Sequence, residues 1–279
     1  MKLNFVKMHG AGNDYIYFDC FKQTVDNPEK LAIALSDRHF GIGGDGIVLI
    51  LPSQKADATM RMFNADGSEG KMCGNAIRCV AKFLFENGYV NSETVTIQTL
   101  SGIKTLKLRL QNQKVESVTV DMGAPILNGL DIPTTIDKPQ VVAHPIEIEG
   151  VEFKVTCVSM GNPHCVVFVD DTDAIPLEQI GPKFEHAPFF PERVNTEFVQ
   201  ILGENALKMR VWERGSGETL ACGTGACAAA VAAVLNGIAS KNDEISVALR
   251  GGELNITVTD QTVFLRGGAT TVFCGEIEI

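Results

Sequence analysis

The sequence predicts an α+β (mixed α/β) fold of two pseudo-symmetric lobes, each a curved sheet wrapped around a central helix. One set of turn residues and cysteines occurs twice at a fixed offset. Each half carries short strand patterns on both sides of one apolar helix. The chain of 279 residues is long enough for two domains, each of roughly 140 residues.

The offset of the repeat is 149 positions. Cys73-Gly74 recurs as Cys222-Gly223 (222 − 73 = 149), and Gly12-Asn13 recurs as Gly161-Asn162. The same offset relates Met60-Arg61 to Met209-Arg210, Asn87-Gly88 to Asn236-Gly237, and Leu100 and Gly102 to Leu249 and Gly251. We therefore expect a first lobe of residues 1–121 plus 267–279, which carries Cys73, and a second lobe of residues 122–266, which carries Cys222.

The central helices are predicted over residues 74–86 and 223–235. In the first, the only charged side chains are Arg78, Lys82 and Glu86, which fall on one stripe and leave the other faces apolar. The second has no charge at all and is expected to be almost wholly buried. Both helices end at Asn-Gly, a common C-terminal signal. A further helix is predicted over residues 28–35.

The strands are predicted from runs of β-branched and aromatic residues bounded by Gly, Asn and Asp. The runs are YIYFD, GIVLIL, TVTIQT and KTLKLRL in the first half, and CVVFVD, TEFVQIL, ISVAL and LNITVT in the second.

Composition excludes several classes of function. A net charge of −10 without a basic block argues against a nucleic-acid or anionic-membrane partner. No apolar run has the roughly 18 residues of a membrane span, and the first residues lack the apolar stretch of a secretory signal. We expect a cytoplasmic protein whose eight cysteines are thiols. No pair has zinc-type spacing, and neither a metal nor a cofactor is expected.

Cys73 and Cys222 each follow a Gly-rich loop and precede a helix. The free N–H groups and the dipole at a helix start stabilise a thiolate. The same positions can bind a carboxylate through the N–H groups of Gly74, Asn75, Gly223 and Thr224. If the lobes face each other, one sulfur can remove a proton from a carbon while the other delivers one to its opposite face.

The other cysteines are expected to be small buried apolar residues: Cys20, Cys79, Cys157, Cys165, Cys227 and Cys274. Two facing thiols could also close to a disulfide, so a redox-sensing or amino-acid-binding protein is the alternative from another class.

The offset also pairs polar residues that are expected to surround the site: Asn13 with Asn162, Asn64 with Glu213, Tyr15 with His164, and Gly46 with Asn195. Arg214 could bind a second carboxylate and Glu213 an ammonium group, unless the two form a surface ion pair. His164 is expected either to tune the protonation of Cys222 or to be structural. The set suits an amino acid with an additional acidic end.

The segment GIGGDG from Gly41 to Gly46 matches G-x-G-x-x-G. It follows a predicted helix and precedes a strand, whereas a dinucleotide-binding motif requires the opposite order. We therefore do not expect a nucleotide site there.

Several segments closely resemble diaminopimelate epimerases: MHGAGNDY, FNADGSEGKMCGNAIRC, SMGNPHCV, VNTEFV and WERGSGETLACGTGACA. The resemblance extends over essentially the whole chain. It implies that the last strand returns to the first. It also implies cofactor-independent interconversion of LL- and meso-2,6-diaminopimelate in lysine and peptidoglycan-precursor biosynthesis, with Cys73 and Cys222 as the acid-base pair.

The substrate contacts that the resemblance implies are Asn13, Asn64, Gly74, Asn75, Asn162, Asn195, Glu213, Arg214, Gly223 and Thr224, and it gives His164 and Glu213 an influence on catalysis. Some members have Gln at the position of Gly46, so a side-chain contact is either lost here or replaced by backbone or water. Proline and hydroxyproline racemases share the two-cysteine chemistry, but Glu213 and Arg214 favour diaminopimelate. The sequence leaves the oligomeric state open, with a homodimer as one option.

Overall fold

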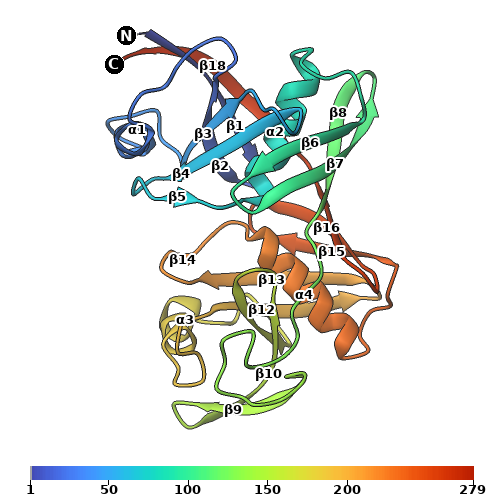
Figure 1. Ribbon diagram of the computed structural model, residues 1–279. Helices are drawn as coiled ribbons and strands as arrows, with labels where there is room; N and C mark the ends of the chain where they lie inside the picture. Colours follow the sequence, from blue (N-terminus) through green and yellow to red (C-terminus); the bar gives the residue numbers. More distant parts are fainter. Residues whose placement is uncertain (1) are drawn as a thin grey trace. The chain divides into compact units, whose positions relative to one another are not determined.

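The computed structural model describes residues 2–279, which divide into two compact units (Figure 1). Unit 1 comprises the positions up to Asp121 together with Arg266–Ile279, and unit 2 comprises Met122–Leu265. The predicted mixed α/β class is confirmed, because each unit combines parallel and antiparallel strands with two helices. No helix within residues 2–279 is both long and apolar enough to cross a membrane.

Unit 1 has nine strands and two helices. The strands are β1 (Lys2–Gly10), β2 (Asn13–Asp19), β3 (Gly46–Leu51), β4 (Ala58–Asn64), β5 (Glu69–Gly70), β6 (Thr94–Thr99), β7 (Gly102–Gln111), β8 (Lys114–Asp121) and β18 (Thr270–Glu278); the helices are α1 (Pro28–Ser36) and α2 (Gly74–Glu86). The last strand, β18, pairs antiparallel with β1, as the resemblance implied. The pairs β2–β3 and β4–β6 are parallel, and the other pairs of this unit are antiparallel.

Unit 2 repeats this plan. Its strands are β9 (His144–Ile148), β10 (Val151–Ser159), β11 (Pro163–Val169), β12 (Asn195–Gly203), β13 (Ala206–Glu213), β14 (Gly217–Glu218), β15 (Glu244–Leu249) and β16 (Gly252–Val258); its helices are α3 (Leu177–Glu185) and α4 (Gly223–Leu235). β17 (Val263–Gly267) includes the position where the chain leaves unit 2. The parallel pairs are β11–β12 and β13–β15.

The registers of the parallel pairs β2–β3 and β11–β12 reproduce the repeat. Tyr15 pairs with Gly46 in unit 1, and His164 pairs with Asn195 in unit 2, so both partners are shifted by 149 (164 − 15 and 195 − 46). After the central helices the offset becomes 150, because Thr99 pairs with Gly102 and Leu249 with Gly252. The expected matches of Leu100 with Leu249 and of Gly102 with Gly251 were therefore wrong by one residue, which unit 2 gains between the end of α4 and β15.

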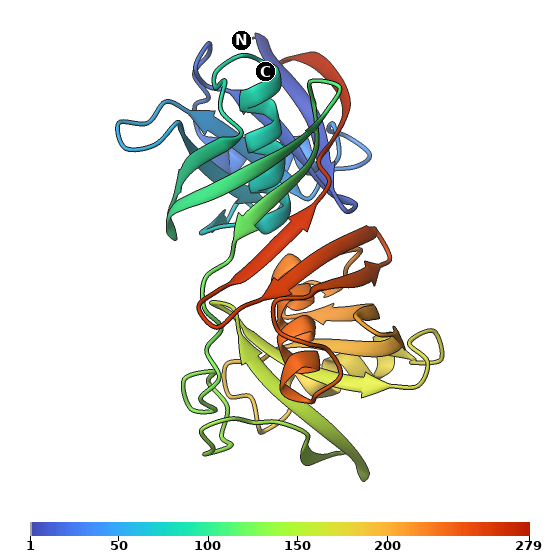
Figure 2. The ribbon, with the colours of Figure 1, turned by 90° about the vertical axis from the view of Figure 1, so that its right-hand side faces the viewer.

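The central helices are buried as predicted. Figure 2 shows α2 and α4, each with the strands of its own unit around it. From Gly223 to Ala233 every residue of α4 except Thr224 is buried, and its Gly and Ala side chains let the sheet approach closely. The charged stripe of α2 runs from a buried residue to an exposed one: Arg78 is wholly buried, Lys82 is partly buried and Glu86 is exposed. Lys82 and Glu86 both hydrogen-bond the backbone of Val115 on β8.

The helix α3 was not predicted, although its bounds follow from α1 by the same offset (28 + 149 = 177 and 36 + 149 = 185). Gly181 and Pro182 lie inside it and weaken the helical pattern. Gly181 is required by packing, since a Cβ at this position would lie 2.4 Å from Cδ2 of Trp212.

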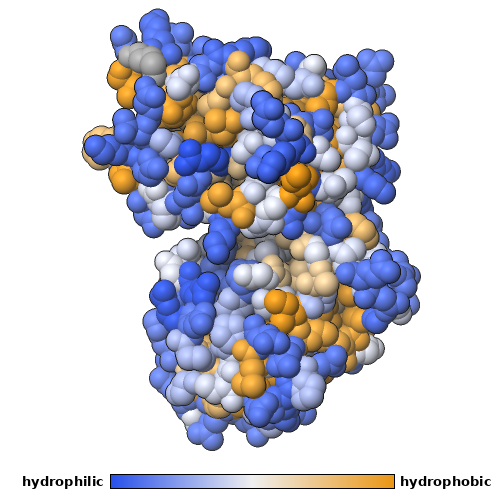
Figure 3. Space-filling view, in the orientation of Figure 1, coloured by the Kyte–Doolittle hydropathy of each residue, from blue (hydrophilic) through white to orange (hydrophobic). Residues whose placement is uncertain are grey.

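All eight cysteines are free thiols. Four of the six expected to be buried apolar residues are buried, namely Cys79, Cys157, Cys165 and Cys227. For Cys274 the expectation was wrong, because the side chains of β18 are largely exposed, and Cys20 is only partly buried at the end of β2. Figure 3 shows hydrophobic side chains in small groups among hydrophilic ones on the viewed face, an ordinary pattern for a protein surface.

Gly46 has no room for a side chain. A Cβ there would lie 2.0 Å from the carbonyl oxygen of Phe63 and 2.8 Å from Cε1 of Tyr15. A Gln side chain at this position would therefore require a different backbone path for β3 or β4.

Gly46→Ala is expected to lower the free energy of unfolding by about 2 kcal/mol or more, since the strand must move to relieve the overlap. Chemical denaturation measures the change. Gly203→Ala is the control, because a Cβ at Gly203 meets nothing within 4 Å. Equal stability of the two variants would contradict the close contact.

Candidate active site

Cys73 is the N-cap of α2 in unit 1. Its sulfur accepts a hydrogen bond from the backbone N–H of Ala76 at 3.5 Å, and its carbonyl accepts from Ile77. Its thiol donates to Oδ1 of Asn13 at 3.4 Å, and the same oxygen accepts from Nδ2 of Asn75 at 3.4 Å. The sequence-predicted residues Asn13, Cys73 and Asn75 therefore form one connected group.

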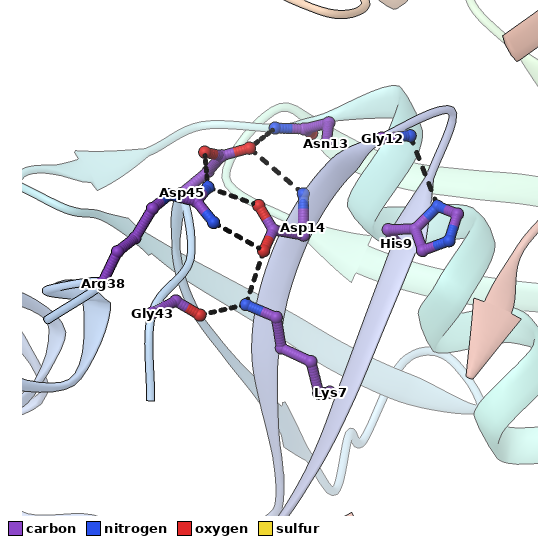
Figure 4. A network of polar contacts seen from close by, with 8 residues as sticks. All are labelled: Lys7, His9, Gly12, Asn13, Asp14, Arg38, Gly43 and Asp45. Carbon is purple, nitrogen blue, oxygen red and sulfur yellow. Dashed lines mark hydrogen bonds and ion pairs between the residues drawn. The ribbon is translucent and has the colours of Figure 1, made fainter. Parts of the chain in front are cut away.

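The turn between β1 and β2 presents Asn13 to the start of α2. Its Nδ2 donates to Asp45 at 2.7 Å (Figure 4). Asn64, at the end of β4, is also predicted for the site, but its side chain donates to Oγ of Ser68 in the following turn at 3.0 Å. Its strand partner is Gly46. Asn64 is thus placed at the same edge of the sheet without a recorded contact to the Cys73 group.

Cys222 is the N-cap of α4 in unit 2. Its sulfur accepts from the N–H of Gly225 at 3.4 Å and lies 3.5 Å from Oγ1 of Thr224. Both cysteines therefore use the sulfur in the position where Ser, Asp or Thr oxygens normally cap a helix. The predicted placement of both thiols at helix starts agrees with the structure.

The expected stabilisation of a thiolate at Cys222 was wrong in its net direction. Burial raises the pKa of the Cys222 thiol well above its usual value, and the carboxylates of Glu213 and Glu197 raise it further. The hydrogen bonds from Thr224 and Gly225 act in the opposite direction but are outweighed. In this state a fully desolvated sulfur keeps its proton at neutral pH.

Glu213 ends β13 beside Cys222. Burial raises the pKa of its carboxyl group, while hydrogen bonds from Thr219 and Cys222 lower it. The hydroxyl of Thr219 donates to Oε1 of Glu213. Arg214 instead donates to the carbonyl of Glu192 at 2.9 Å, so the two adjacent charged residues have separate partners and do not form the surface ion pair considered as an alternative.

His164 is wholly buried on β11. Its Nδ1 lies 2.7 Å from Oε1 of Glu197, and its Nε2 lies 3.0 Å from Oδ1 of Asn162. Glu197 is also wholly buried, and its Oε1 lies 2.7 Å from the position a Cβ would take at Gly225. His164 is thus tied to Asn162 and, through Glu197, to the start of α4.

Asn195 fixes the backbone around this group. Its Nδ2 donates to the carbonyl of Pro163 at 2.8 Å, and its Oδ1 accepts from the N–H of Arg214 at 2.9 Å. Both polar ends of the buried side chain are therefore used inside the protein.

The first N–H groups of both central helices are available to a ligand. Within residues 2–279 no acceptor is recorded for the N–H groups of Gly74, Asn75, Gly223 and Thr224. Each pair adjoins a thiol and points along the positive end of a buried helix, an arrangement that binds an anionic group next to an acid-base sulfur.

Three polar residues beside these groups were not singled out from the sequence: Asp45, Glu197 and Thr219. Glu197 and Thr219 lie inside segments that carried the resemblance, and their types alone gave no reason to select them. Asp45 lies in GIGGDG, a segment considered only as a nucleotide-binding motif and given no other role.

This chain is similar along its whole length to proteins of one family. The family model described as "Diaminopimelate epimerase" matches residues 5–127 and 156–272. A protein of that name from Acetivibrio thermocellus is 56% identical over 99% of both chains. Another from Methanococcus maripaludis strain S2 is 52% identical over 99% of this chain and all of its own.

Solved structures with lower identity share the fold. A phenazine biosynthesis protein of the PhzF family from Bacillus anthracis has a TM-score of 0.73 at 17% identity, covering all of both chains. A probable proline racemase from Agrobacterium radiobacter has a TM-score of 0.71 at 16% identity, covering 99% of this chain and 93% of its own. From the family match and the full-length relatives, the chain belongs to the diaminopimelate epimerase family.

Proposed function

We propose that this protein interconverts LL- and meso-2,6-diaminopimelate by proton transfer at the α-carbon, in the biosynthesis of lysine and peptidoglycan precursors. Membership of the family supports the substrate. The observation that carries the mechanism is the matched pair of cysteine N-caps, Cys73 on α2 and Cys222 on α4.

Inversion of an α-carbon requires removal of its proton on one face and delivery of another proton on the opposite face. We assign these steps to Cys73 and Cys222, one as thiolate and the other as thiol. Each turnover leaves the sulfurs with exchanged protonation states, so the same pair serves both directions. The chemistry requires that both sulfurs reach the same carbon during turnover, and it needs no metal or cofactor.

The substrate's α-carboxylate is assigned to the N–H groups of Gly74, Asn75, Gly223 and Thr224. Negative charge spreads onto this carboxylate as the α-proton leaves, and preorganised donors at a helix start stabilise that charge. The remaining polar contacts to substrate are assigned to Asn13, Asn64, Asn162 and Asn195, with Glu213 for an ammonium group and Arg214 for the distal carboxylate.

Deprotonation of Cys222 requires an environment that differs from the free state, because burial and two carboxylates raise its pKa. The ammonium group of a bound substrate beside Glu213 would offset part of that negative charge. We assign His164 and Glu213 to this control of protonation. We also propose a cytoplasmic location, because the mechanism needs free thiols and disulfides are disfavoured in the cytoplasm.

In deuterated water, the wild-type protein is expected to incorporate deuterium at the α-carbon of diaminopimelate while inverting it. Cys73→Ala and Cys222→Ala should each lower kcat by at least about 10³-fold, since either change removes one of the two proton-transfer groups. NMR of the substrate measures both effects.

Cys79→Ala and Cys227→Ala are the matched controls, because these thiols are also buried in α2 and α4. L-Proline and trans-4-hydroxy-L-proline, tested in the same assay, should not exchange. Turnover that survives both substitutions would contradict the mechanism, and faster exchange of proline would contradict the substrate.

Glu213→Gln is expected to move the alkylation midpoint of Cys222 to lower pH. The carboxylate of Glu213 raises the Cys222 pKa, so its removal lowers that pKa, while the larger effect of burial persists. Iodoacetamide labelling across pH, read at the Cys222 peptide by mass spectrometry, measures the midpoint. Glu204→Gln, at an exposed position of the same unit, should leave it unchanged. A midpoint that stays fixed or rises in Glu213→Gln would refute this assignment.

We also propose that the protein forms a homodimer through β18. This strand pairs with β1, and its side chains Val272 and Phe273 are 54% and 47% exposed. Exposed apolar side chains on neighbouring residues offer a surface that a second copy of the chain can cover.

Phe273→Asp is expected to shift the protein from dimer to monomer in analytical ultracentrifugation. Val151→Asp, at an equally exposed apolar residue of unit 2, should not. A monomeric wild-type protein would end the proposal.

A further inference from the structure

A continuous chain of side-chain hydrogen bonds crosses the Cys73 end of unit 1. Asn13 donates through Nδ2 to Asp45 at 2.7 Å and accepts through Oδ1 from Asn75 at 3.4 Å. Asn75 in turn accepts through Oδ1 from Nη2 of Arg78 at 2.9 Å. The chain therefore begins at a carboxylate, passes through two amides and ends at a guanidinium group.

The charges at the two ends determine which way both amides point. A carboxylate can only accept, so Asn13 must turn its NH₂ group toward Asp45. A guanidinium group can only donate, so Asn75 must turn its oxygen toward Arg78 and its NH₂ group toward Asn13. Both constraints give Asn13 the same orientation, with Oδ1 facing Cys73.

Both ends of the chain are themselves held in place. Figure 4 shows Asp45 between Asn13, the backbone N–H of Asp14 and Arg38; the N–H bond measures 3.1 Å and the ion pair with Arg38 measures 3.0 Å. Arg78 is wholly buried and also donates to the carbonyls of Gly74 and Gly268 at 2.9 and 3.2 Å. Neither charge can turn away without losing several contacts.

We propose that Asp45 and Arg78 are positioning residues that hold the Asn13 oxygen against the Cys73 thiol and so keep this sulfur protonated before the substrate binds. The inference rests on the proposed role of Cys73. An amide oxygen at 3.4 Å accepts from a thiol but repels a thiolate, whereas a flipped amide would donate to a thiolate instead. With this orientation Cys73 is the acid for the stereoisomer whose α-proton faces Cys222. Cys222 first loses its proton to solvent; its thiolate then takes the α-proton as the substrate's C–H bond breaks, while the S–H bond of Cys73 breaks and the new C–H bond forms.

Other titratable groups of unit 1 near Cys73 do not supply the same control. Burial raises the pKa of Cys79 to about 11 and that of Tyr17 well above its usual value, so both stay neutral near pH 7. Burial raises the pKa of Asp14, but the ion pairs with Arg38 and Lys7 outweigh this and leave the pKa below its ordinary value. His9 accepts from the N–H of Gly12, next to Asn13, at 3.3 Å. Its contribution to the protonation of Cys73 is measured with a His9→Gln variant.

The test is the pH dependence of Cys73 alkylation in the full-length protein. Asp45→Asn replaces an obligatory acceptor by a group that can also donate, so Asn13 is free to flip. The midpoint of iodoacetamide labelling at the Cys73 peptide should move to lower pH. For each decrease of about one pH unit in this midpoint, the labelling rate of Cys73 at pH 7 should rise about tenfold. Thermal unfolding of the same sample verifies that the variant is folded.

The control Asp14→Asn removes the same charge from the same ion-pair cluster without touching the Asn13 side chain. Asp45→Glu keeps an obligatory acceptor and should restore most of the wild-type midpoint. Asp57 is an exposed residue just before β4, and its carboxylate accepts a hydrogen bond from the N–H of Thr96. Asp57→Asn should therefore leave the Cys73 midpoint as in wild type. An unchanged midpoint in Asp45→Asn, or an equal change in Asp14→Asn, would overturn the proposal.

The readout separates this inference from the proposed function. Labelling requires no turnover, so a lowered midpoint in a protein that does not epimerise diaminopimelate supports the positioning role and rejects only the activity. If Asp45→Asn keeps the wild-type midpoint and the wild-type protein has full epimerase activity, the positioning role is rejected and the activity is supported.

Discussion

The structure depends on placing a sulfur at the start of a buried helix. The cap position supplies N–H donors that favour a thiolate, while burial among protein atoms disfavours any charge there. At Cys222 burial prevails, with two carboxylates acting in the same direction. A thiol that keeps its proton until ligand charge arrives is spared oxidation and alkylation in the free protein. The opposed effects thus give a thiol that is unreactive in the free protein and becomes reactive when a ligand binds.

The repeat gives both units the same backbone arrangement, but the two units carry different side chains at equivalent positions. The ion pairs Arg61–Glu69 and Arg210–Glu218 hold equivalent loops, since both partners differ by 149. Around the sulfurs the units diverge: amides and an obligatory acceptor surround Cys73, whereas Glu213, Glu197 and His164 adjoin the Cys222 end. A symmetric backbone with unequal side chains suits a reaction whose two proton-transfer steps are related but whose substrate has two different ends.

Much of the fold and the composition of the site follow from sequence patterns, and the failures have physical reasons. Turn glycines and cap residues mark α2 and α4 because they act locally. The helix α3 was missed because Gly181 is set by its contact with Trp212, which no local pattern contains. The burial of Arg78 and the bond from Asn13 to Asp45 depend on side chains that meet only in the folded unit, so spacing alone did not reveal them. The direction of the Cys222 pKa likewise required the actual packing.

The connection that leaves α4 is one residue longer in unit 2 than its counterpart in unit 1. There the offset grows from 149 at Asn236-Gly237 to 150 at β15. This connection lies at the C-terminal end of a thirteen-residue helix, opposite the capped sulfur. Loop length at that end is therefore uncoupled from the chemistry, which makes it the natural point for inserting a reporter peptide or opening a circular permutant.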